Sequence, residues 1–346
     1  MILRRGLSRV GTQILTTTRG TGPFRVDNLL AAEHYVGQFR ARHCGRHLFD
    51  VEAPVQIPAS FDYVRASTVD DAITLLDRHG PESRVVAGGH SLLPMMKLRL
   101  ARPDWLIDIN DLFELDFVLR DGNTLRVGAM TRHATLLDSP DISRLFPIVG
   151  DAERVIADPT VRNRGTIGGS LCQADPAEDL STVCKVLRAE AVIRGPGGER
   201  VLSMDDFHRG AYETAVAHNE LLCEVRFPIR PRSGSAYEKV ERRVGDWAVV
   251  AAGAAMSLAE DGTIDDVTVG LTAVGVAGTV TEAEVLLRGR QPREDLFVEA
   301  GRLAALASDP VADQRGPVDY KRHLADELTR RVLRRAAARA VESQEG

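Results

Sequence analysis

Two glycine-rich stretches hold the residue types best suited to binding a charged ligand. Residues 87–91 read AGGHS and residues 166–170 read TIGGS, so each places paired glycines beside a hydroxyl side chain. Paired glycines let the backbone approach a ligand closely, and successive N–H groups can form a concave site for phosphate oxygens. One such turn is ordinarily structural. Two of them predict a dinucleotide diphosphate held between two lobes, with hydroxyl hydrogen bonds from Ser91, Thr166 and Ser170.

Other kinds of site find little support in the sequence. Neither stretch is the GxGxxG of a Rossmann unit or the GxxxxGK[ST] of a P-loop. The four cysteines, Cys44, Cys172, Cys184 and Cys223, form no CxxC pair and have no histidine at zinc-ligand spacing. We therefore expect no metal site and no iron–sulfur cluster held by this chain alone. No nucleophile–base arrangement stands out, so we name no catalytic residue.

Length and composition indicate a globular protein of several domains. The chain has 346 residues, of which 44% are hydrophobic, and its formal net charge of -5 gives no general attraction for nucleic acid. No apolar run approaches the roughly 20 residues that span a bilayer, and the N-terminal region lacks the apolar core of a secretory signal. We expect a cytoplasmic protein that does not bind nucleic acid.

The elements that must position the two turns are predicted from periodicity. Residues 1–55 show no regular pattern, and we expect a poorly ordered extension or upstream sequence included by a misplaced start codon. Residues 56–114 form a first lobe of helix, strand, turn, helix and strand. Its first helix begins after Ser67 or Thr68, its strands are Val85–Ala87 and Leu106–Ile109, and its second helix is Ser91–Leu100.

Residues 115–230 form a second lobe and residues 235–346 a third unit. In the second lobe we predict a hairpin of Leu115–Val118 and Thr124–Val127, a helix before Asp158-Pro159, and strands at Ala191–Ile193 and Leu221–Phe227. After a linker at residues 228–234, two strands, Val249–Leu258 and Val267–Val274, precede helices. The last helix, Tyr320–Val341, carries many arginines, which we interpret as a solvated face or subunit contact.

The flanks of the two turns give a specific resemblance. AGGHSLLPMMKLRLA, at residues 87–101, and TIGGSLCQADPAEDL, at residues 166–180, resemble the two FAD-binding signatures of the molybdenum hydroxylase flavoprotein subunits. The similarity extends from about Pro58 to the C-terminal helix. It implies an α+β fold, in which a two-lobed FAD-binding domain of the vanillyl-alcohol-oxidase/PCMH type precedes a C-terminal α+β domain with a small antiparallel sheet and helices.

The resemblance also implies which residues bind FAD. The first turn cradles the diphosphate through backbone amides, with His90 supporting the turn rather than acting in catalysis. The second turn approaches the flavin and its diphosphate. Together the two turns contribute Ala87, Gly88, Gly89, His90, Ser91, Thr166, Ile167, Gly168, Gly169 and Ser170.

Four further residues match family positions beside the cofactor, and each has a plainer alternative. Asp179 would hydrogen-bond the FAD, or act as a helix N-cap. Leu222 would contact the flavin or adenine through its backbone, and could be strand core as well. Lys239 would lie near the isoalloxazine, where a cation favours the anionic reduced ring, or be an exposed strand lysine. Trp247 would cover one flavin face, or be an ordinary core tryptophan.

For function, the resemblance implies an electron relay. A large subunit with a molybdenum-pterin cofactor oxidises substrate, and a small subunit with [2Fe-2S] clusters passes single electrons. FAD in this chain then delivers them to a quinone or another external acceptor. We expect a dimer of heterotrimers, and leave open whether the complex attaches to the inner face of the membrane.

Two segments favour the aerobic carbon monoxide dehydrogenase branch of the family: GDWAVV, from Gly245, and DQRGPVDYKRHL, at residues 313–324. The medium subunit of a xanthine, nicotinate or aldehyde hydroxylase is the nearest alternative. A stand-alone FAD reductase resembling the UDP-N-acetylenolpyruvoylglucosamine reductases is another, because related folds host several functions. A scaffold protein that has lost its flavin is the third, and the intact glycine turns argue against it.

Overall fold

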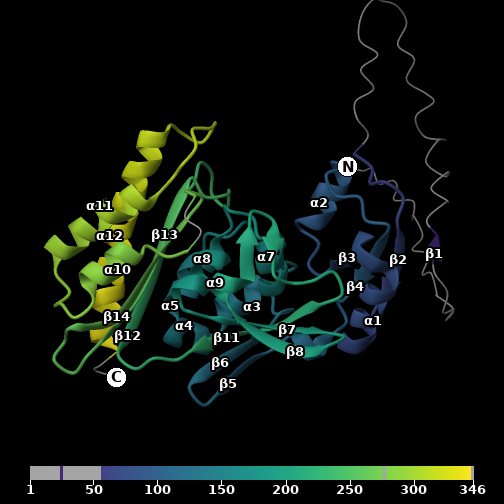
Figure 1. Cartoon of the computed structure of the whole chain (residues 1–346), viewed down its shortest axis with the longest axis horizontal. Helices are drawn as coiled ribbons and strands as arrows, with labels where there is room; N and C mark the ends of the chain where they lie inside the picture. The colour runs from purple at the N-terminus through teal and green to yellow at the C-terminus, as the bar shows by residue number, and fades with distance from the viewer. Residues whose placement is uncertain (1–23, 26–55, 276–277, 344–346) are drawn as a thin grey trace, which may run out of the picture.

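In the described residues, three sheets of three or more strands follow one another along the chain, each in its own part of the molecule (Figure 1). The computed structural model describes residues 24–25, 56–275 and 278–343. The predicted extension at residues 1–55 lies outside the described residues, apart from the two-residue strand β1 (Phe24–Arg25), which pairs with β2. Helices and mainly antiparallel sheets alternate irregularly, so the predicted α+β class is confirmed.

Lobe 1 is a four-stranded sheet in the order β1-β2-β4-β3, and its last three strands are parallel. Parallel neighbours need crossover connections, which α1 and α2 supply. The predicted order of helix, strand, turn, helix and strand is confirmed. The elements are β2 (Asp62–Arg65), α1 (Val69–His79), the 3-10 turn η1 (Gly80–Glu82), β3 (Ser83–Val86), α2 (Leu92–Lys97), β4 (Trp105–Asp108) and the 3-10 turn η2 (Phe113–Leu115).

The ends of the lobe 1 helices have local causes. Thr68 is the N-cap of α1, because its hydroxyl accepts a hydrogen bond of 3.0 Å from the N–H of Asp71. The second helix was predicted to reach Leu100, but α2 ends at Lys97. Arg99 has φ 58°, a left-handed conformation in which an α-helix cannot continue.

Lobe 2 is a five-stranded antiparallel sheet in the order β5-β6-β11-β7-β8, covered by short helices. A separate pair, β9 with β10, lies beside it. The elements are β5 (Val118–Asp121), β6 (Thr124–Gly128), α3 (His133–Asp138), α4 (Pro140–Leu145), α5 (Pro147–Glu153), α6 (Pro159–Arg162), α7 (Ile167–Gln173), α8 (Asp179–Val186), β7 (Glu190–Gly195), β8 (Gly198–Ser203), α9 (Met204–Phe207), β9 (His208–Gly210), β10 (Glu213–Thr214) and β11 (Leu221–Pro228).

The first hairpin of lobe 2 corrects one prediction. Its first strand was expected at Leu115–Val118, but β5 begins only at Val118. The turn is a tight one, because Asp121 pairs directly with Thr124 and Gly122 has φ 57°. A two-residue turn shifts the first strand toward the turn and leaves Leu115 in η2, where its side chain packs into the lobe 1 core.

The C-terminal domain consists of a three-stranded antiparallel sheet and three helices. Its elements are β12 (Ser233–Val240), β13 (Val250–Leu258), β14 (Ile264–Thr272), α10 (Thr281–Leu287), α11 (Glu294–Ala307) and α12 (Val318–Glu342). The first two residues of β12, Ser233 and Gly234, were predicted as linker. The first buried residues of this strand, Gly234, Ser235 and Ala236, are small and poor strand formers, so the strand forms through its packing rather than its local preference.

The C-terminal sheet lies between α12 on one face and the lobe 2 helices α5 and α8 on the other (Figure 1). Its buried face toward lobe 2 includes Tyr237 and Ala251, which join the lobe 2 core, whereas Ala252 and Val269 belong to the core under α12. An antiparallel sheet usually has one solvated face. Here both faces are buried, which fixes the C-terminal domain against lobe 2.

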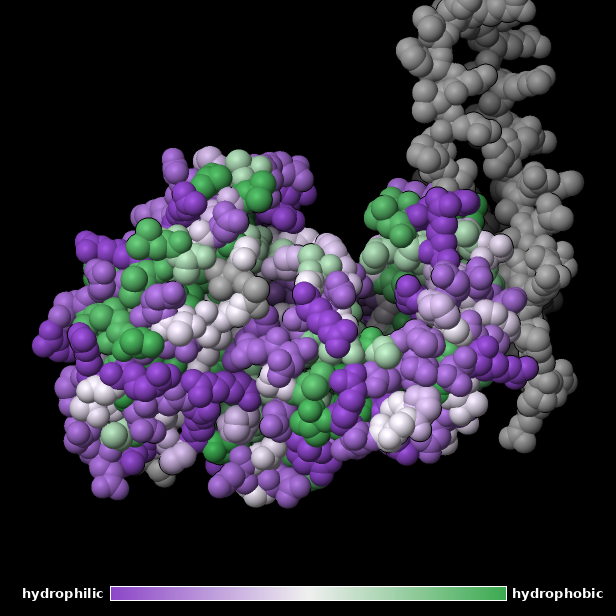
Figure 2. All heavy atoms as spheres, viewed as in Figure 1, coloured by the Kyte–Doolittle hydropathy of each residue, from purple (hydrophilic) through white to green (hydrophobic). Residues whose placement is uncertain are grey.

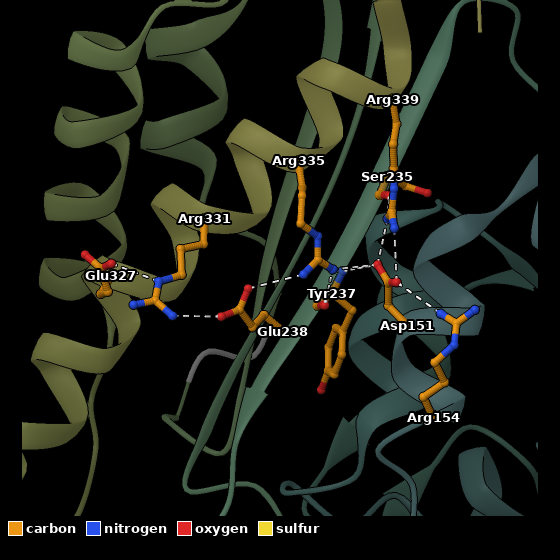
Figure 3. Close-up of polar contacts among 9 residues, drawn as sticks. All are labelled: Asp151, Arg154, Ser235, Tyr237, Glu238, Glu327, Arg331, Arg335 and Arg339. Carbon is orange, nitrogen blue, oxygen red and sulfur yellow. Dashed lines mark hydrogen bonds and ion pairs between the residues drawn. The ribbon is translucent and has the colours of Figure 1, made fainter. Parts of the chain in front are cut away.

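Polar contacts reinforce this seam, as Figure 3 shows. Arg335 and Arg339 of α12 reach Asp151 of α5, with Nη–Oδ2 distances of 2.7 and 2.6 Å. The same guanidinium groups donate to the carbonyl oxygens of Tyr237 and Ser235. The interpretation of the α12 arginines as a solvated face or subunit contact is therefore wrong for these two, because both hold the helix to lobe 2.

Candidate functional site

A large cavity lies where the two predicted turns meet. Its volume is about 960 Å³, and it is lined by residues from lobe 1, lobe 2 and the loop between β12 and β13. Figure 2 shows the surface hollowed between lobe 1 and the central part of the molecule. A cleft of this size between lobes is typical of a cofactor or substrate site.

The first turn, residues 87–91, follows β3 and precedes α2. Among the hydrogen bonds of the described residues, none is donated by the backbone N–H of Gly88, Gly89, His90 or Ser91. Gly89 has φ 80°, which a side chain would strain. Ser91 occupies the N-cap position of α2 without making a capping bond, so its hydroxyl is also available. This turn offers backbone donors to an anion, as the sequence predicts.

The second turn, residues 166–170, differs from that prediction. Thr166 is the N-cap of α7, and its hydroxyl accepts a bond of 3.0 Å from the N–H of Gly169. The N–H groups of Ile167, Gly168 and Ser170 donate to the carbonyl oxygens of Thr131, Ala129 and Thr166, respectively. All four amides are thus used inside the protein. The second turn therefore offers fewer free backbone donors than the first, and its contact with a bound ligand stays a prediction.

The glycines of the second lobe serve close packing instead. A Cβ on Gly168 would lie 2.6 Å from the carbonyl oxygen of Ala129. The first turn also touches the residues just before the second, because a Cβ on Gly88 would lie 2.3 Å from the carbonyl oxygen of Arg164 and 2.7 Å from the Cα of Gly165. Only glycine allows this approach. Both turns therefore border one shared cavity.

The structure brings nearly all the predicted site residues together. With one exception they line the cavity, namely Ala87, Gly88, Gly89, His90, Ser91, Thr166, Gly168, Gly169, Ser170, Asp179, Leu222, Lys239 and Trp247. The exception is Ile167, whose side chain is buried in the lobe 2 core. Ile167 was predicted only because it lies within the turn. Its side chain points away from the cavity and into the core.

Asp179 and Lys239 form a buried ion pair at the cavity wall. The Lys239 ammonium lies 3.0 Å from Asp179 Oδ2 and 3.3 Å from a Glu241 oxygen, and its side chain is only 1% exposed. It also donates to the carbonyl oxygens of Val155 and Asp246. The alternative of an exposed strand lysine is therefore wrong. The positive charge of Lys239 is balanced by two carboxylates.

Asp179 is not the N-cap of α8, which was its alternative role. That position belongs to Glu178, whose carboxylate accepts from the N–H groups of Leu180 and Ser181. Asp179 instead accepts a 2.7 Å hydrogen bond from the Tyr237 hydroxyl. Burial raises the pKa of Asp179 to about 6, although Lys239 and Tyr237 act in the opposite direction.

Trp247 and Leu222 complete the wall. Trp247 is 43% exposed, which excludes the core alternative and leaves its indole accessible from the cavity. Leu222 is 3% exposed and pairs with Ile193 of β7, so it is strand core as well as cavity wall. Its backbone contact with a cofactor stays a prediction.

Two features of the site were missed in the sequence. His133 lines the cavity and pairs with the fully buried Glu153, at 3.0 and 3.1 Å from Nδ1 to the two carboxylate oxygens. These residues are far apart in sequence, so no local pattern indicates the pair. Glu178, which also accepts from the Ser170 hydroxyl at 2.7 Å, could have been found. An acidic residue directly before an apolar helical run is a common N-terminal signal.

Two kinds of feature are absent from the described residues. Among residues 24–25, 56–275 and 278–343, no group of His, Cys, Asp or Glu side chains could hold a metal ion. In the same part of the chain, no helix combines the length and apolar character needed to cross a bilayer.

Comparison with known proteins defines the class. Residues 59–230 match the family model described as the FAD binding domain in molybdopterin dehydrogenase, and residues 235–336 match the CO dehydrogenase flavoprotein C-terminal domain. The fold and the cavity are thus those of an FAD-dependent oxidoreductase subunit. The chain belongs to the family of carbon monoxide dehydrogenase medium chains and related FAD-binding subunits of molybdenum hydroxylases.

The matches to individual relatives cover almost the whole length of each relative. The carbon monoxide dehydrogenase medium chain of Afipia carboxidovorans is 38% identical over 82% of this chain and 99% of its own. Caffeine dehydrogenase subunit beta of a Pseudomonas species is 34% identical over 82% of this chain and 97% of its own. A structure of carbon monoxide dehydrogenase from Hydrogenophaga pseudoflava matches with a TM-score of 0.79 at 38% identity, covering 82% of this chain and 99% of the matched chain.

Proposed function

We propose that this chain is the FAD-carrying electron-transfer subunit of an aerobic carbon monoxide dehydrogenase. It takes electrons from [2Fe-2S] clusters of a small partner subunit and passes them to an external acceptor such as a quinone. A large partner subunit with a molybdenum-pterin cofactor oxidises the substrate, and the assembly is a dimer of heterotrimers. Identity of 38% to the carbon monoxide dehydrogenase medium chains supports this proposal.

The observation that carries the proposal is the cavity beneath the first turn. It combines four unused backbone N–H groups, at Gly88 to Ser91, with a volume of about 960 Å³ that continues along lobe 2 to Trp247. Open amides suit the diphosphate of FAD, and the long remainder of the cavity suits its flavin and adenosine ends. The residues present therefore fit the cofactor.

When bound, FAD supplies the ability to accept electrons one at a time and to release one or two. The chain's own residues position it. The first turn would hold the diphosphate, with the Ser91 hydroxyl beside it. Lys239, fixed by Asp179 and Glu241, would place a positive charge near the ring, and Trp247 would cover one ring face while the other stays open.

No residue of this chain is assigned to bond making or breaking. His90 is exposed and lies on the first turn, where we give it a supporting role. Electron transfer requires a held cofactor, a tuned potential and an accessible exit face, rather than a general acid or base. The site fits that requirement.

The test is purification of the complex from a host that expresses all its subunits. We expect a yellow preparation that contains a large and a small partner chain, and release of FAD on denaturation. Carbon monoxide should bleach the flavin absorbance only when both partners are present. A chain that stays colourless after incubation with FAD would overturn the proposal and revive the flavin-free scaffold.

A related substrate is the second candidate, because caffeine dehydrogenase subunit beta is 34% identical to this chain. The residues that choose the substrate would lie in the large subunit. Bleaching of the flavin by a purine, nicotinate or aldehyde, and not by carbon monoxide, would favour this reading. Oxidation of NADPH by the isolated chain, coupled to a soluble substrate, would instead favour a stand-alone reductase.

A further inference from the structure

His133 lies at the place where the two turns meet. The backbone N–H of His133 donates to the carbonyl oxygen of Gly165 at 3.1 Å. A Cβ on Gly165 would lie 2.7 Å from Cδ2 and 3.2 Å from Nε2 of the His133 ring. Gly165 in turn touches Gly88 of the first turn. The imidazole therefore packs against Gly165, next to its contact with Gly88, and it lines the cavity.

The charge of this histidine is set by Glu153. The Glu153 carboxylate is completely buried, and among the described residues its hydrogen bonds are those to His133 Nδ1. A buried carboxylate is costly unless it is paired with a cation or a donor, so Nδ1 must carry a proton. Burial by itself would lower the pKa of His133, but the charge and hydrogen bond of Glu153 raise it above its ordinary value.

The other ring nitrogen is free to bind a ligand. Nε2 of His133 makes no hydrogen bond to the described residues. It is also not one of their buried, unpaired polar atoms, so it is accessible from the cavity. With Nδ1 held by Glu153, the protonated ring presents Nε2–H as a charged donor. A charged donor at a cavity wall suits an anionic oxygen.

The second turn has no free backbone donor among its four amides. All of them, at Ile167 to Ser170, already donate to acceptors inside the protein. On the neighbouring C-terminal domain, the Lys239 ammonium is surrounded by two carboxylates and two carbonyl oxygens, so its charge is already balanced. A phosphate oxygen that faces lobe 2 therefore meets no free amide of this turn and no unpaired ammonium at Lys239.

We propose that His133, held by Glu153, is the lobe 2 ligand of the dinucleotide diphosphate, donating Nε2–H to a phosphate oxygen opposite the amides of the first turn. This inference rests on the proposed function, because it takes the bound molecule to be FAD. It adds one charged side chain to the lobe 2 wall of the site. The diphosphate would then be held by amides from lobe 1 and by imidazole from lobe 2.

Three carboxyl groups near His133 favour its protonated form. Glu153 comes from α5, and the carboxyl groups of Glu178 and Asp179 at the start of α8 act in the same direction. Removing the Glu153 charge should therefore let the ring lose its proton at a lower pH. A purely structural histidine would show no such effect on ligand binding.

The test uses the purified full-length chain after flavin removal, with ADP as the probe for the diphosphate and riboflavin as the probe for the ring. In calorimetric titrations at pH 6, we expect His133→Gln to weaken ADP binding about tenfold or more, the usual effect of losing a hydrogen bond to a charged group. Riboflavin affinity should stay within about twofold. Equal ADP affinity in the variant and the unmodified chain would overturn the inference.

A matched control and a second variant keep the test decisive. His208→Gln changes another largely buried histidine, which bonds to the Leu171 carbonyl and does not line the cavity, so its ADP affinity should not change. Glu153→Gln should shift the pH dependence of ADP binding to lower pH. If His133→Gln does not fold, His133→Gln with Glu153→Gln removes both charges and gives the same comparison.

The outcomes also separate this inference from the proposed function. If the unmodified chain binds FAD and ADP, and the two His133 variants bind ADP equally well, only the inference fails. If the unmodified chain binds neither FAD nor riboflavin at micromolar concentration, the proposed function fails with it. A pH midpoint for ADP binding that Glu153→Gln leaves unchanged also contradicts the role of the pair.

Discussion

The hydroxyl of Tyr237 donates a 2.7 Å hydrogen bond to Asp179 Oδ1, and this contact joins the C-terminal domain to the wall of the cofactor cavity. The same oxygen of Tyr237 lies 3.1 Å from the hydroxyl of Thr272, which donates to Thr182 on α8. Tyr237 is completely enclosed and belongs to β12, so the sheet of one domain fixes a carboxylate of another. The cavity therefore depends on the C-terminal domain as well as on the two lobes.

Asp179 should give the free energy of unfolding a specific pH dependence. Its pKa is raised from an ordinary 3.8 to about 6, so the folded chain holds this proton more tightly than the unfolded chain. The stability that this group contributes is then lost as pH rises through that interval. Asp179→Asn should remove the decline, as measured by urea unfolding at a series of pH values. An identical slope in both proteins would contradict the assignment.

Tyr237→Phe should act on the same group in the opposite direction. Without the hydroxyl donor the carboxylate form of Asp179 loses support, so its pKa should rise further and the decline should extend above pH 6. The variant should also lose about 1–3 kcal/mol of stability at neutral pH, since a buried acceptor is left unpaired. Tyr212→Phe is the control, because Tyr212 is 59% exposed and its hydroxyl donates a solvent-exposed hydrogen bond to the Asp175 carboxylate.

Gly88→Ala tests the contact between the two turns. The added methyl group would meet the carbonyl oxygen of Arg164 at 2.3 Å, and backbone cannot move aside as a flexible side chain can. We expect the lobes to separate locally, at a cost of about 1–3 kcal/mol in unfolding free energy and with weaker FAD binding. Gly197→Ala is the matched control, because nothing lies within 4 Å of its added methyl group. Equal effects of the two substitutions would refute the contact.

Local patterns predicted much of this architecture. The first turn follows a strand and precedes a helix, and both are visible in the periodicity around residues 83–97. The α1 cap at Thr68 and the strands β11, β13 and β14 follow from the same short-range rules. These features depend on neighbours in the sequence, which is why a single chain is enough to find them.

What the sequence could not predict depends on contacts between distant segments. The use of the second turn's amides comes from the carbonyl oxygens of Ala129 and Thr131, which lie nearly forty residues earlier. His133 meets Glu153 through the packing of α3 on α5, and Lys239 is buried by Asp179 rather than exposed. Residue type and spacing say that these groups are polar, but only the fold decides which partner neutralises each one.

Trp247 offers a direct optical test of cofactor placement. The chain has two tryptophans, Trp105 and Trp247. Trp247 lines the cavity, whereas Trp105 stacks on His79 with ring centroids 3.8 Å apart. If the Trp247 indole covers the flavin, FAD binding should quench most of its emission, and Trp105→Phe should preserve that quenching. Trp247→Phe should abolish it. Quenching that survives in Trp247→Phe would place the flavin elsewhere.

The ion pair between Asp151 and Arg339 should be worth more than an exposed pair on the neighbouring helix α11. Asp151 also accepts from Arg335 and from the Tyr237 N–H, and it is mostly buried, so Arg339→Ala should cost about 1.5–3 kcal/mol in thermal or urea unfolding. Arg302→Ala, in an exposed pair with Glu299, should cost within about 0.5 kcal/mol.

Acid titration distinguishes this ion pair from simple packing. Burial would raise the pKa of Asp151, but Arg339 and Arg335 outweigh it and hold the pKa below its ordinary 3.8. The stabilisation is therefore present above pH 3.8 and is lost as pH falls through the folded-state pKa. The difference in stability between the unmodified chain and Arg339→Ala should shrink in that range. A difference that stays constant down to pH 3 would show that Arg339 acts through its hydrocarbon stem, and the charge of Asp151 would have no part in joining α12 to lobe 2.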